Sequence, residues 1–441
     1  MRRRHFLSTV GVGIASIAGG CLGDDESSTA TGRTDTAPPR STTGATEPVE
    51  PTGTATSRPR SSLTVDGEFR AARADVGTPV ADFETAGSWS ASRGDASLQS
   101  GERVRGERAL RLSTDRTESE AIACREFDAP RDFSNRGFSL AAKWEAPSDA
   151  WYQVALTLRD ADGDFLRFTQ VVEAPHRSDW HRLDLGVHSV GGDPDLTRVT
   201  GMDVMTWVGD GASRVFVDDL RSVPTADTGY VLFTFDDAPE SAYTVAYPAM
   251  RERGFAGCVG VIKRHLGHSG YLSLDRMDEM AAAGWEFCSH PQFDRALPEM
   301  GLDRLDDTLA AYKSWLYDHG FDRGAETMIY PYGAVDDAAL EVVADYHRLA
   351  FKVERGQYSP RVSSPLLLGR TDGDRFESVC QAIDRAARYG LVVPIMYHAL
   401  NAEGRISKAD FEATVDLVAD TDGIEVITPS EYLSKLRAGE L

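Results

Sequence analysis

The sequence predicts two folded parts, an all-β sandwich followed by an α/β domain built on parallel strands. From about Leu63 to Val223, short stretches alternate apolar and polar residues and are separated by turns rich in Gly and Asp, a pattern typical of antiparallel strands. From Tyr230 to the end, apolar strand-like stretches alternate with longer helical ones, and such repeated units indicate a parallel sheet or barrel. We therefore expect domains at residues 63–223 and 225–441.

The composition suits a folded protein with an acidic surface. The chain has 441 residues, of which 41% are hydrophobic, and a net charge of −22 from 69 acidic and 47 basic residues. Only six of the basic residues are Lys. Acid-rich, Lys-poor chains are typical of proteins that work in very high salt, because surface carboxylates keep them hydrated; an arginine preference set by genome composition is the alternative. No basic face or run is evident, so nucleic acid is not an expected partner.

The first residues resemble an export signal. "MRRRHFLSTVGVGIASIAGGC" begins with three arginines and continues with an apolar stretch at 10–17 that is too short to span a bilayer. The arginines resemble a twin-arginine (Tat) signal, and "AGGC" resembles a lipobox, although Ala18 stands where Leu is usual. We expect residues 1–22 to be a lipoprotein signal of the halophilic archaeal type. The chain would then be anchored through a lipid on Cys21 at the extracellular face of the cell membrane.

The next segment and the remaining cysteines carry less information. Residues 23–62 are rich in Thr, Ser and Pro and predict a disordered tether. The other cysteines show no C-x-x-C spacing, so buried free thiols are expected; whether Cys258 and Cys288 meet on neighbouring strands is left open.

The predicted sandwich resembles the jelly-roll carbohydrate-binding modules that accompany sugar-processing enzymes. "ADFETAGSW", "RGERALRLS" and "VFVDDL" carry this resemblance. Its tryptophans are predicted either to stack on sugar rings or to pack in the core; they are Trp89, Trp144, Trp151, Trp180 and Trp207. Asp82, Glu84 and Asp218 are predicted to bind a structural calcium ion or to be solvated turn residues. A truncated chain that begins near Thr225 is expected to fold and act without the sandwich.

The α/β part places polar residues where its predicted strands end. Asp236 and Asp237 follow "YVLFTF", and His290, Tyr332 and His398 follow three later strands. In parallel sheets and barrels these ends meet on one face, where chemistry occurs. Carboxylates and histidines without a G-x-S-x-G nucleophile motif or a Gly-rich phosphate loop favour metal-assisted hydrolysis. The other histidines are expected to have surface or packing roles; they are His176, His181, His188, His265, His268, His319 and His347.

Four motifs in this part resemble the NodB-homology domain of polysaccharide deacetylases. They are "TFDDA", "GWEFCSHPQFDRAL", "YPYG" and "IMYHAL", which lie in the family's order between about Tyr230 and Leu436. The resemblance implies a distorted parallel (β/α) barrel of NodB type. It also implies a metal-dependent hydrolase that removes N-acetyl groups from an extracellular or surface polysaccharide, acting as a monomer with zinc or another divalent ion.

The same resemblance implies roles for individual residues. Asp236 becomes the general base and His398 the general acid, whereas Asp237 and His290 become metal ligands. The backbone near Tyr332 would hold the oxyanion.

Three departures from the family pattern bear on the site. Asp294 stands where a second His is usual, which makes it the expected third ligand and shifts the metal preference toward harder ions. Ala238 replaces the Gly that follows the acid pair. The Arg that orients the base is missing from "MIYPYG", and Arg370 in "LGRTD" is the expected substitute. Two alternatives remain: a catalytically inactive carbohydrate-binding protein, or a hydrolase of another amide or ester.

Overall fold

The computed structural model describes residues 58–115, 117–146, 151–173, 179–208, 212–291, 296–353 and 356–441. The predicted signal, Cys21, most of the predicted tether, His176 and the expected ligand Asp294 lie outside these ranges.

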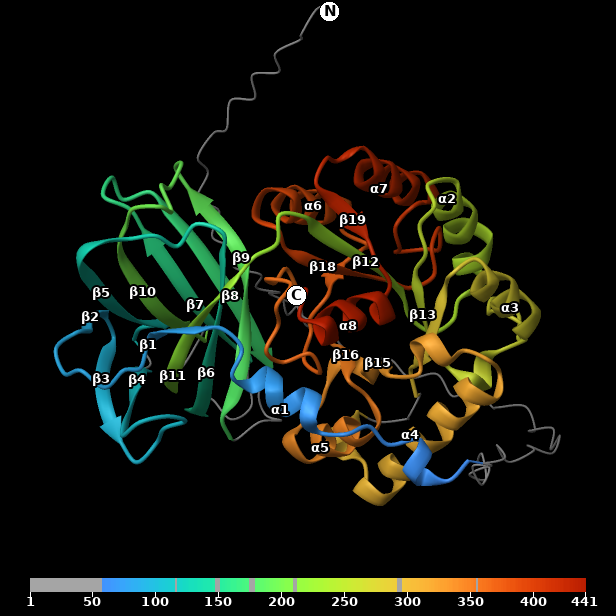
Figure 1. Ribbon diagram of the computed structural model, residues 1–441, viewed down its shortest axis with the longest axis horizontal. Coiled ribbons are helices and arrows are strands. Elements are labelled where there is room, and N and C mark those ends of the chain that lie inside the picture. The colour runs from blue at the N-terminus through green and yellow to red at the C-terminus, as the bar shows by residue number, and fades with distance from the viewer. Residues whose placement is uncertain are drawn as a thin grey trace, which may run out of the picture. The chain divides into compact units, whose positions relative to one another are not determined.

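The first folded part is an antiparallel β-structure (Figure 1). Its strands are β1 (Thr78–Ala81), β2 (Ser90–Arg93), β3 (Asp95–Ser100), β4 (Arg108–Thr114), β5 (Glu120–Arg131), β6 (Arg136–Ala146), β7 (Trp151–Arg159), β8 (Phe165–Glu173), β9 (His181–Gly191), β10 (Val199–Trp207) and β11 (Ser213–Pro224). The strand order is β2-β5-β10-β7-β8-β9-β6-β11-β4-β3, with β1 beside β11. Strands β4 and β5, from opposite ends of this order, pack together, and their apolar side chains share one core. The prediction of an all-β part is therefore confirmed, and the finer jelly-roll assignment stays a prediction.

The second part is an α/β structure in which every strand pairing is parallel. Its strands are β12 (Gly229–Phe235), β13 (Cys258–Val261), β14 (Glu286–Ser289), β15 (Thr327–Ile329), β16 (Leu349–Phe351), β17 (Thr371–Asp372), β18 (Val392–Tyr397) and β19 (Ile424–Val426). Its helices are α2 (Tyr247–Glu252), α3 (Leu274–Ala282), α4 (Leu302–Asp318), α5 (Asp337–Tyr346), α6 (Phe376–Tyr389), α7 (Lys408–Asp420) and α8 (Pro429–Ala438).

The parallel sheet curls so that its two edge strands approach each other. The order is β16-β15-β14-β13-β12-β18-β17, with β19 also on β12. Leu368, just before β17, pairs with Phe351 of β16, and its carbonyl accepts a hydrogen bond from the Lys352 N–H at 2.7 Å. The segment that leads into β17 therefore links both edges, which fits the predicted distorted (β/α) barrel.

Residues 58–74 differ from the sequence-based boundaries, which assign them to the tether and the sandwich. A short helix, α1 (Glu68–Ala74), lies beside α5 (Figure 1), where Arg70 contacts Glu341 of α5 at 2.7 Å. Leu63 is fully buried in a cluster with Leu305 of α4 and Val343 of α5. The apolar Leu63 side chain loses its contact with water in this cluster, which ties residues 58–74 to the α/β part.

Two of the five sandwich tryptophans pack against other aromatic rings. Trp144 is buried and lies 4.6 Å from the Tyr152 ring, and Trp89 packs 5.2 Å from the Phe83 ring. Trp180 and Trp207 are partly buried, whereas the Trp151 side chain lies outside the described part. The core interpretation therefore fits Trp144 best.

Two of the three carboxylates predicted to bind calcium or to be solvated turn residues accept backbone hydrogen bonds from a loop. Asp218 Oδ2 accepts from the N–H groups of Val104 and Arg105 at 2.7 and 2.9 Å. Glu84 Oε1 accepts from the N–H groups of Glu107 and Arg108 at 2.7 and 3.0 Å. These contacts give Asp218 and Glu84 a structural role, and the calcium assignment stays a prediction.

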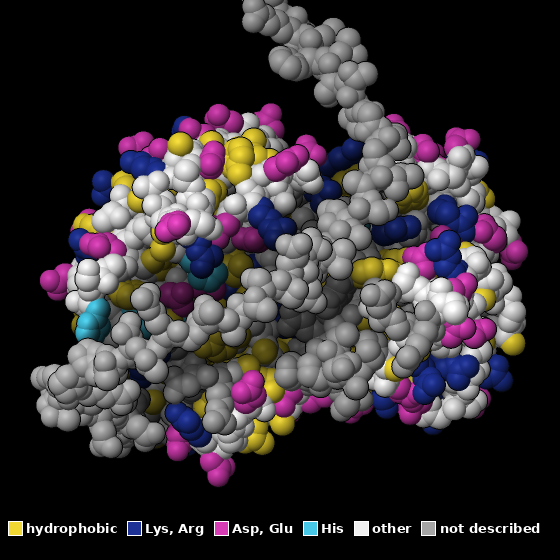
Figure 2. Space-filling view, turned by 180° about the vertical axis from the view of Figure 1, so that it is seen from behind, with side chains coloured by type: hydrophobic (Ala, Val, Ile, Leu, Met, Phe, Trp, Pro, Cys, Tyr) yellow, Lys and Arg dark blue, Asp and Glu magenta, His cyan; other side chains and the backbone are white. Residues whose placement is uncertain are grey.

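Acidic and basic side chains are interspersed on the face shown in Figure 2. Within the described ranges, no helix is long and apolar enough to cross a membrane.

Candidate active site

The site is built where β12 ends, at the centre of the curled sheet. Every residue of "GYVLFTF" is buried, because the strand lies between β13 and β18 with helices packed outside. Phe235 pairs with Tyr397, the last residue of β18, and the Asp236 N–H donates to the Tyr397 carbonyl at 2.8 Å. Asp236 and His398 therefore occupy equivalent positions at the ends of neighbouring strands.

Asp236 is held by a buried arginine from a distant part of the chain. Arg370 has no exposed surface, and its guanidinium donates to Asp236 Oδ1 at 2.6 Å and Oδ2 at 2.8 Å. Burial by itself raises the pKa of the Asp236 carboxyl, but the charge and hydrogen bonds of Arg370 outweigh it, so that this pKa lies below its ordinary value. Asp236 is therefore a carboxylate at neutral pH, with its orientation fixed at two points.

Asp237 points the other way, toward His290. Asp237 and Ala238 have φ angles of 71° and 54°, in the left-handed region that side-chain-bearing residues seldom adopt. Two such residues in succession turn the chain sharply at the end of β12 and separate the two carboxylates. Ala238 thus adopts the conformation for which the resembled motif has Gly.

His290 is oriented as a metal-binding histidine would be. It follows β14, is 7% exposed, and its Nδ1 lies 2.9 Å from the Ile329 carbonyl oxygen. A carbonyl only accepts, so Nδ1 carries the proton and Nε2 faces Asp237 Oδ1 at 3.3 Å. Burial lowers the pKa of His290, but the hydrogen bond to Asp237 outweighs it and the net shift is upward. For Asp237, burial raises the pKa and His290 more than reverses that effect.

His398 lies after β18 and is partly exposed. Its Nδ1 is 3.4 Å from an NH₂ group of Arg405, which in turn contacts Asp374 at 2.8 Å. This contact leaves Nε2 as the ring atom available to a substrate. The sequence analysis did not single out Arg405 or Asp374, because their relation to His398 arises only from the folded loops.

Tyr332 lies at the rim of the site. It follows β15, its φ is 57°, and it is 63% exposed. Val353, which follows the neighbouring strand β16, is 37% exposed. The two residues form an apolar rim at adjacent strand ends.

His265 packs against Tyr271, near the chain segment that follows Asp237. Its ring lies 4.3 Å from that of Tyr271, which bridges to Pro239, two residues after Asp237. Burial lowers the pKa of His265, and the charges of Asp237 and His290 also act on it. His265 therefore has a packing role beside the segment that follows Asp237, which is one of the two roles predicted for it.

Asp237 and His290 fit two ligands of a divalent metal ion. One carboxylate oxygen faces an imidazole nitrogen whose partner nitrogen is fixed by a carbonyl, an arrangement common at metal sites. Within the described residues, no group of three or more His, Cys, Asp or Glu side chains has the geometry to hold a metal. The expected third ligand, Asp294, is outside those residues.

Part of the α/β structure is similar in sequence to known proteins. Residues 224–349 match the polysaccharide deacetylase family model. The protein YxkH of Bacillus subtilis is 29% identical over 111 residues, which cover 25% of this chain and 39% of YxkH. The poly-beta-1,6-N-acetyl-D-glucosamine N-deacetylase of Staphylococcus aureus is 29% identical over 126 residues, covering 26% and 43% of the two chains. The chain thus spans about two fifths of the length of these relatives.

Among the solved structures that the chain matches is a family 4 carbohydrate esterase from Streptomyces lividans in complex with acetate. It is 17% identical, has a TM-score of 0.32, and the match covers 44% of this chain and 90% of that one.

Proposed function

We propose that the chain is a metal-dependent hydrolase that removes N-acetyl groups from an extracellular or surface polysaccharide. The observation that carries this proposal is the pairing of Asp236 with Arg370 directly beside the contact between Asp237 and His290. An ionised base and two metal-type ligands thus occur together where β12 and β14 end, without a nucleophilic side chain in the motif. The match of residues 224–349 to the family model supports the substrate class.

A divalent ion would be held by Asp237 and His290, with Asp294 as the third ligand. When bound, such an ion supplies Lewis-acid polarisation of the acetamide carbonyl and lowers the pKa of a water molecule. Zinc suits the His ligand, whereas two carboxylates among three ligands also suit harder ions.

Asp236 acts as the general base in this proposal. Its pKa is depressed, so it is ionised when the substrate arrives and accepts the proton of the attacking water. Arg370 keeps both carboxylate oxygens in place and thereby fixes the direction from which the proton is taken. Arg370 is fully buried, so its role is to orient the base and not to touch the substrate.

His398 acts as the general acid on the amide nitrogen. An amide anion is too poor a leaving group to depart unaided, so the nitrogen must be protonated as the carbon–nitrogen bond breaks. The exposed ring of Tyr332 offers a surface for the sugar, and the backbone beside it is the proposed oxyanion donor.

The location is also a proposal. A Tat signal, a lipid on Cys21 and a tether would place the enzyme at the extracellular face of the membrane, where its polysaccharide would be found. The acidic composition supports work in high salt.

Acetate released from a panel of N-acetylated and O-acetylated glycans tests the proposal. We expect release from N-acetylated polymers, loss after chelation and recovery when one divalent metal is added. Binding to the polymers without acetate release would instead identify an inactive carbohydrate-binding protein. Release from O-acetylated glycans alone would identify an esterase.

A further inference from the structure

The segment that carries Arg370 differs from most of the other connections between barrel strands. Between β16 and β17, the described residues 352, 353 and 356–370 form no helix, although helices precede most of the other barrel strands. Arg370 lies at the end of this segment, immediately before β17. What holds the segment therefore also decides where the guanidinium contacts Asp236.

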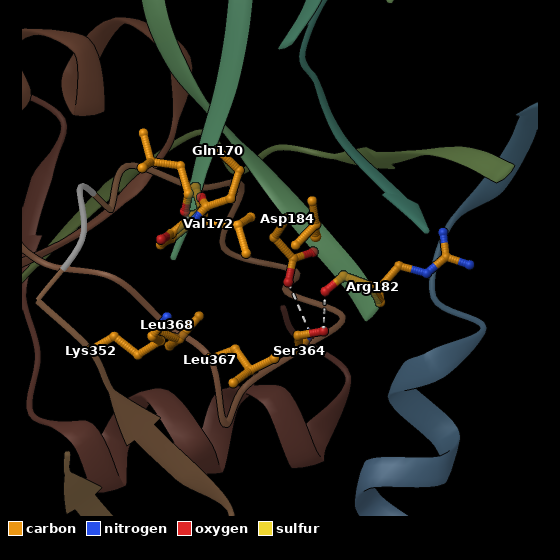
Figure 3. A pocket seen from close by; sticks show the side chains of 11 residues that line it. Gln170, Val172, Arg182, Asp184, Lys352, Ser364, Leu367 and Leu368 are labelled. Atoms are coloured by element: carbon orange, nitrogen blue, oxygen red, sulfur yellow. Dashed lines mark hydrogen bonds between the residues drawn. The ribbon is translucent and has the colours of Figure 1, made fainter. Parts of the chain in front are cut away.

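Strand β9 of the sandwich supplies that support. Both carboxylate oxygens of Asp184 accept from the Ser363 N–H at 2.9 Å, and the Ser363 hydroxyl and the Ser364 N–H add bonds at 2.6 and 2.9 Å. The Ser364 hydroxyl donates to the Arg182 carbonyl at 2.8 Å. Figure 3 shows Ser364 facing these two β9 residues. All of these donors converge on the sandwich, so an uncharged apolar residue at position 184 would leave buried donors unsatisfied.

The two backbones also approach each other closely. A Cβ atom at Gly186 of β9 would lie 2.4 Å from the Gln357 carbonyl oxygen, and one at Gly137 of β6 would lie 2.2 Å from the Ser359 Cβ. The Val187 N–H donates to the same Gln357 carbonyl at 3.2 Å. Only glycine permits contacts this short, so the sandwich surface and the segment are fitted to each other.

The segment in turn fixes Arg370. The Lys352 carbonyl accepts from Arg370 Nε at 2.8 Å, and the Tyr358 hydroxyl accepts from the Gly369 N–H at 2.8 Å. Lys352 and Tyr358 also line, with Asp184, a cavity of about 20 Å³ between the segment and the sandwich (Figure 3). The cavity has room for about one water molecule, so Lys352 and Tyr358, which hold Arg370 and its neighbour Gly369, lie close to β9.

We propose that the sandwich is a positioning element of the active site, and that Asp184 positions Arg370 and, through it, Asp236. The inference rests on the proposed role of Asp236 as the base. It assigns the sandwich a part in catalysis that differs from sugar binding: without Asp184, the segment would move and the two-point contact on the base would loosen. Because a misplacement on the order of 1 Å can cost about a hundredfold in rate, the effect should appear in kcat.

The test uses the full chain with Asp184→Ala, and Ser363→Ala as a milder variant that removes one bond. The matched control is Asp193→Ala, an exposed carboxylate of the same part that contacts Arg388 at 3.5 Å. We expect kcat to fall by about tenfold to a hundredfold in Asp184→Ala, with KM, bound metal and soluble yield unchanged, and no change in the control. Ser363→Ala should lie between, and it keeps the test decisive if Asp184→Ala does not fold.

A double variant separates positioning from a general loss of structure. If Asp184 acts through Arg370, Asp184→Ala adds no further loss of kcat to Arg370→Lys; multiplied losses would overturn the proposal. Amide hydrogen exchange provides a readout without activity: residues 356–370 should exchange faster in Asp184→Ala than in Asp193→Ala. Unchanged exchange in Asp184→Ala would overturn the positioning role, whether or not the wild-type protein is active. An inactive wild-type protein would instead count against the proposed function.

Discussion

Arg370 and Asp236 are 134 positions apart in the sequence, yet their side chains form a two-point ion pair with distances of 2.6 and 2.8 Å. The arginine is fully buried and the aspartate nearly so. Buried ion pairs are costly unless their geometry and hydrogen bonds are complete. Here two of the three remaining N–H donors of the guanidinium reach Thr234 Oγ1 and the Lys352 carbonyl. The contact is therefore a fixed feature of the site and not a surface pair.

Arg370→Lys should slow hydrolysis and move its pH dependence. A lysine keeps the charge but loses the planar two-point contact, so the pKa of Asp236, which burial alone would raise, should rise. Because the base must be ionised, the acidic limb of the pH–rate profile should then move to higher pH, with kcat falling by about 10²-fold or less. Arg375→Lys is the control, since Arg375 is exposed and pairs with Asp372. An unchanged profile for Arg370→Lys would argue against a role in orienting the base.

His398→Ala should affect amide substrates more than activated esters. A good leaving group needs no proton, so loss of the general acid should reduce amide turnover by about 10²–10⁴-fold and ester turnover much less. Rates on an N-acetylated and an activated acetyl ester substrate measure the difference. Equal losses on both would assign His398 a binding or structural role.

The sequence predicts those parts of the site that depend on local patterns, but not the contacts between residues far apart in the chain. The strand ends that carry Asp236, Asp237, His290 and His398 follow from local apolar patterns, and a parallel sheet brings such ends to one face. Their partners do not follow: Asp184 is 179 positions from Ser363, and no local pattern connects them. Asp294 stays a prediction, because it lies outside the described residues.

Leu63→Ala should destabilise the α/β part, although Leu63 precedes the sandwich. The side chain is fully buried among residues of α4 and α5, and removing a buried leucine costs about 2–5 kcal/mol. Leu302→Ala is the control, because Leu302 on α4 is 45% exposed and should change stability by less than about 0.5 kcal/mol. Denaturant unfolding measures both, and equal midpoints would contradict the packing of residues 58–74.

The same contacts alter the expectation for a chain that begins near Thr225. Such a chain lacks Leu63 and the Asp184 bonds to the segment before Arg370. We now expect it to be less stable and less active on small substrates than the full chain, and equal activity of the two would contradict this.

His347 should make the protein less stable below about pH 6.5. The ring is 1% exposed; burial, and then the charge of Lys313, lower its pKa well below the ordinary value. Below the pKa of the unfolded state, the unfolded chain binds a proton at His347 and the folded chain does not. The free energy of unfolding therefore decreases as the pH is lowered, by at most about 1.4 kcal/mol per pH unit. His347→Gln should flatten this slope, whereas His319→Gln, at an exposed position, should not. An unchanged slope in His347→Gln would contradict the buried neutral histidine.

Acetate release by Asp236→Asn, compared with the wild-type protein at equal metal content, tests the central claim most directly. Asparagine has nearly the same shape but accepts no proton, so turnover of an N-acetylated polysaccharide should fall by about 10²–10⁴-fold while the metal content is kept. Asp236→Asn protein that releases acetate at the wild-type rate would contradict the assignment of Asp236 as the base.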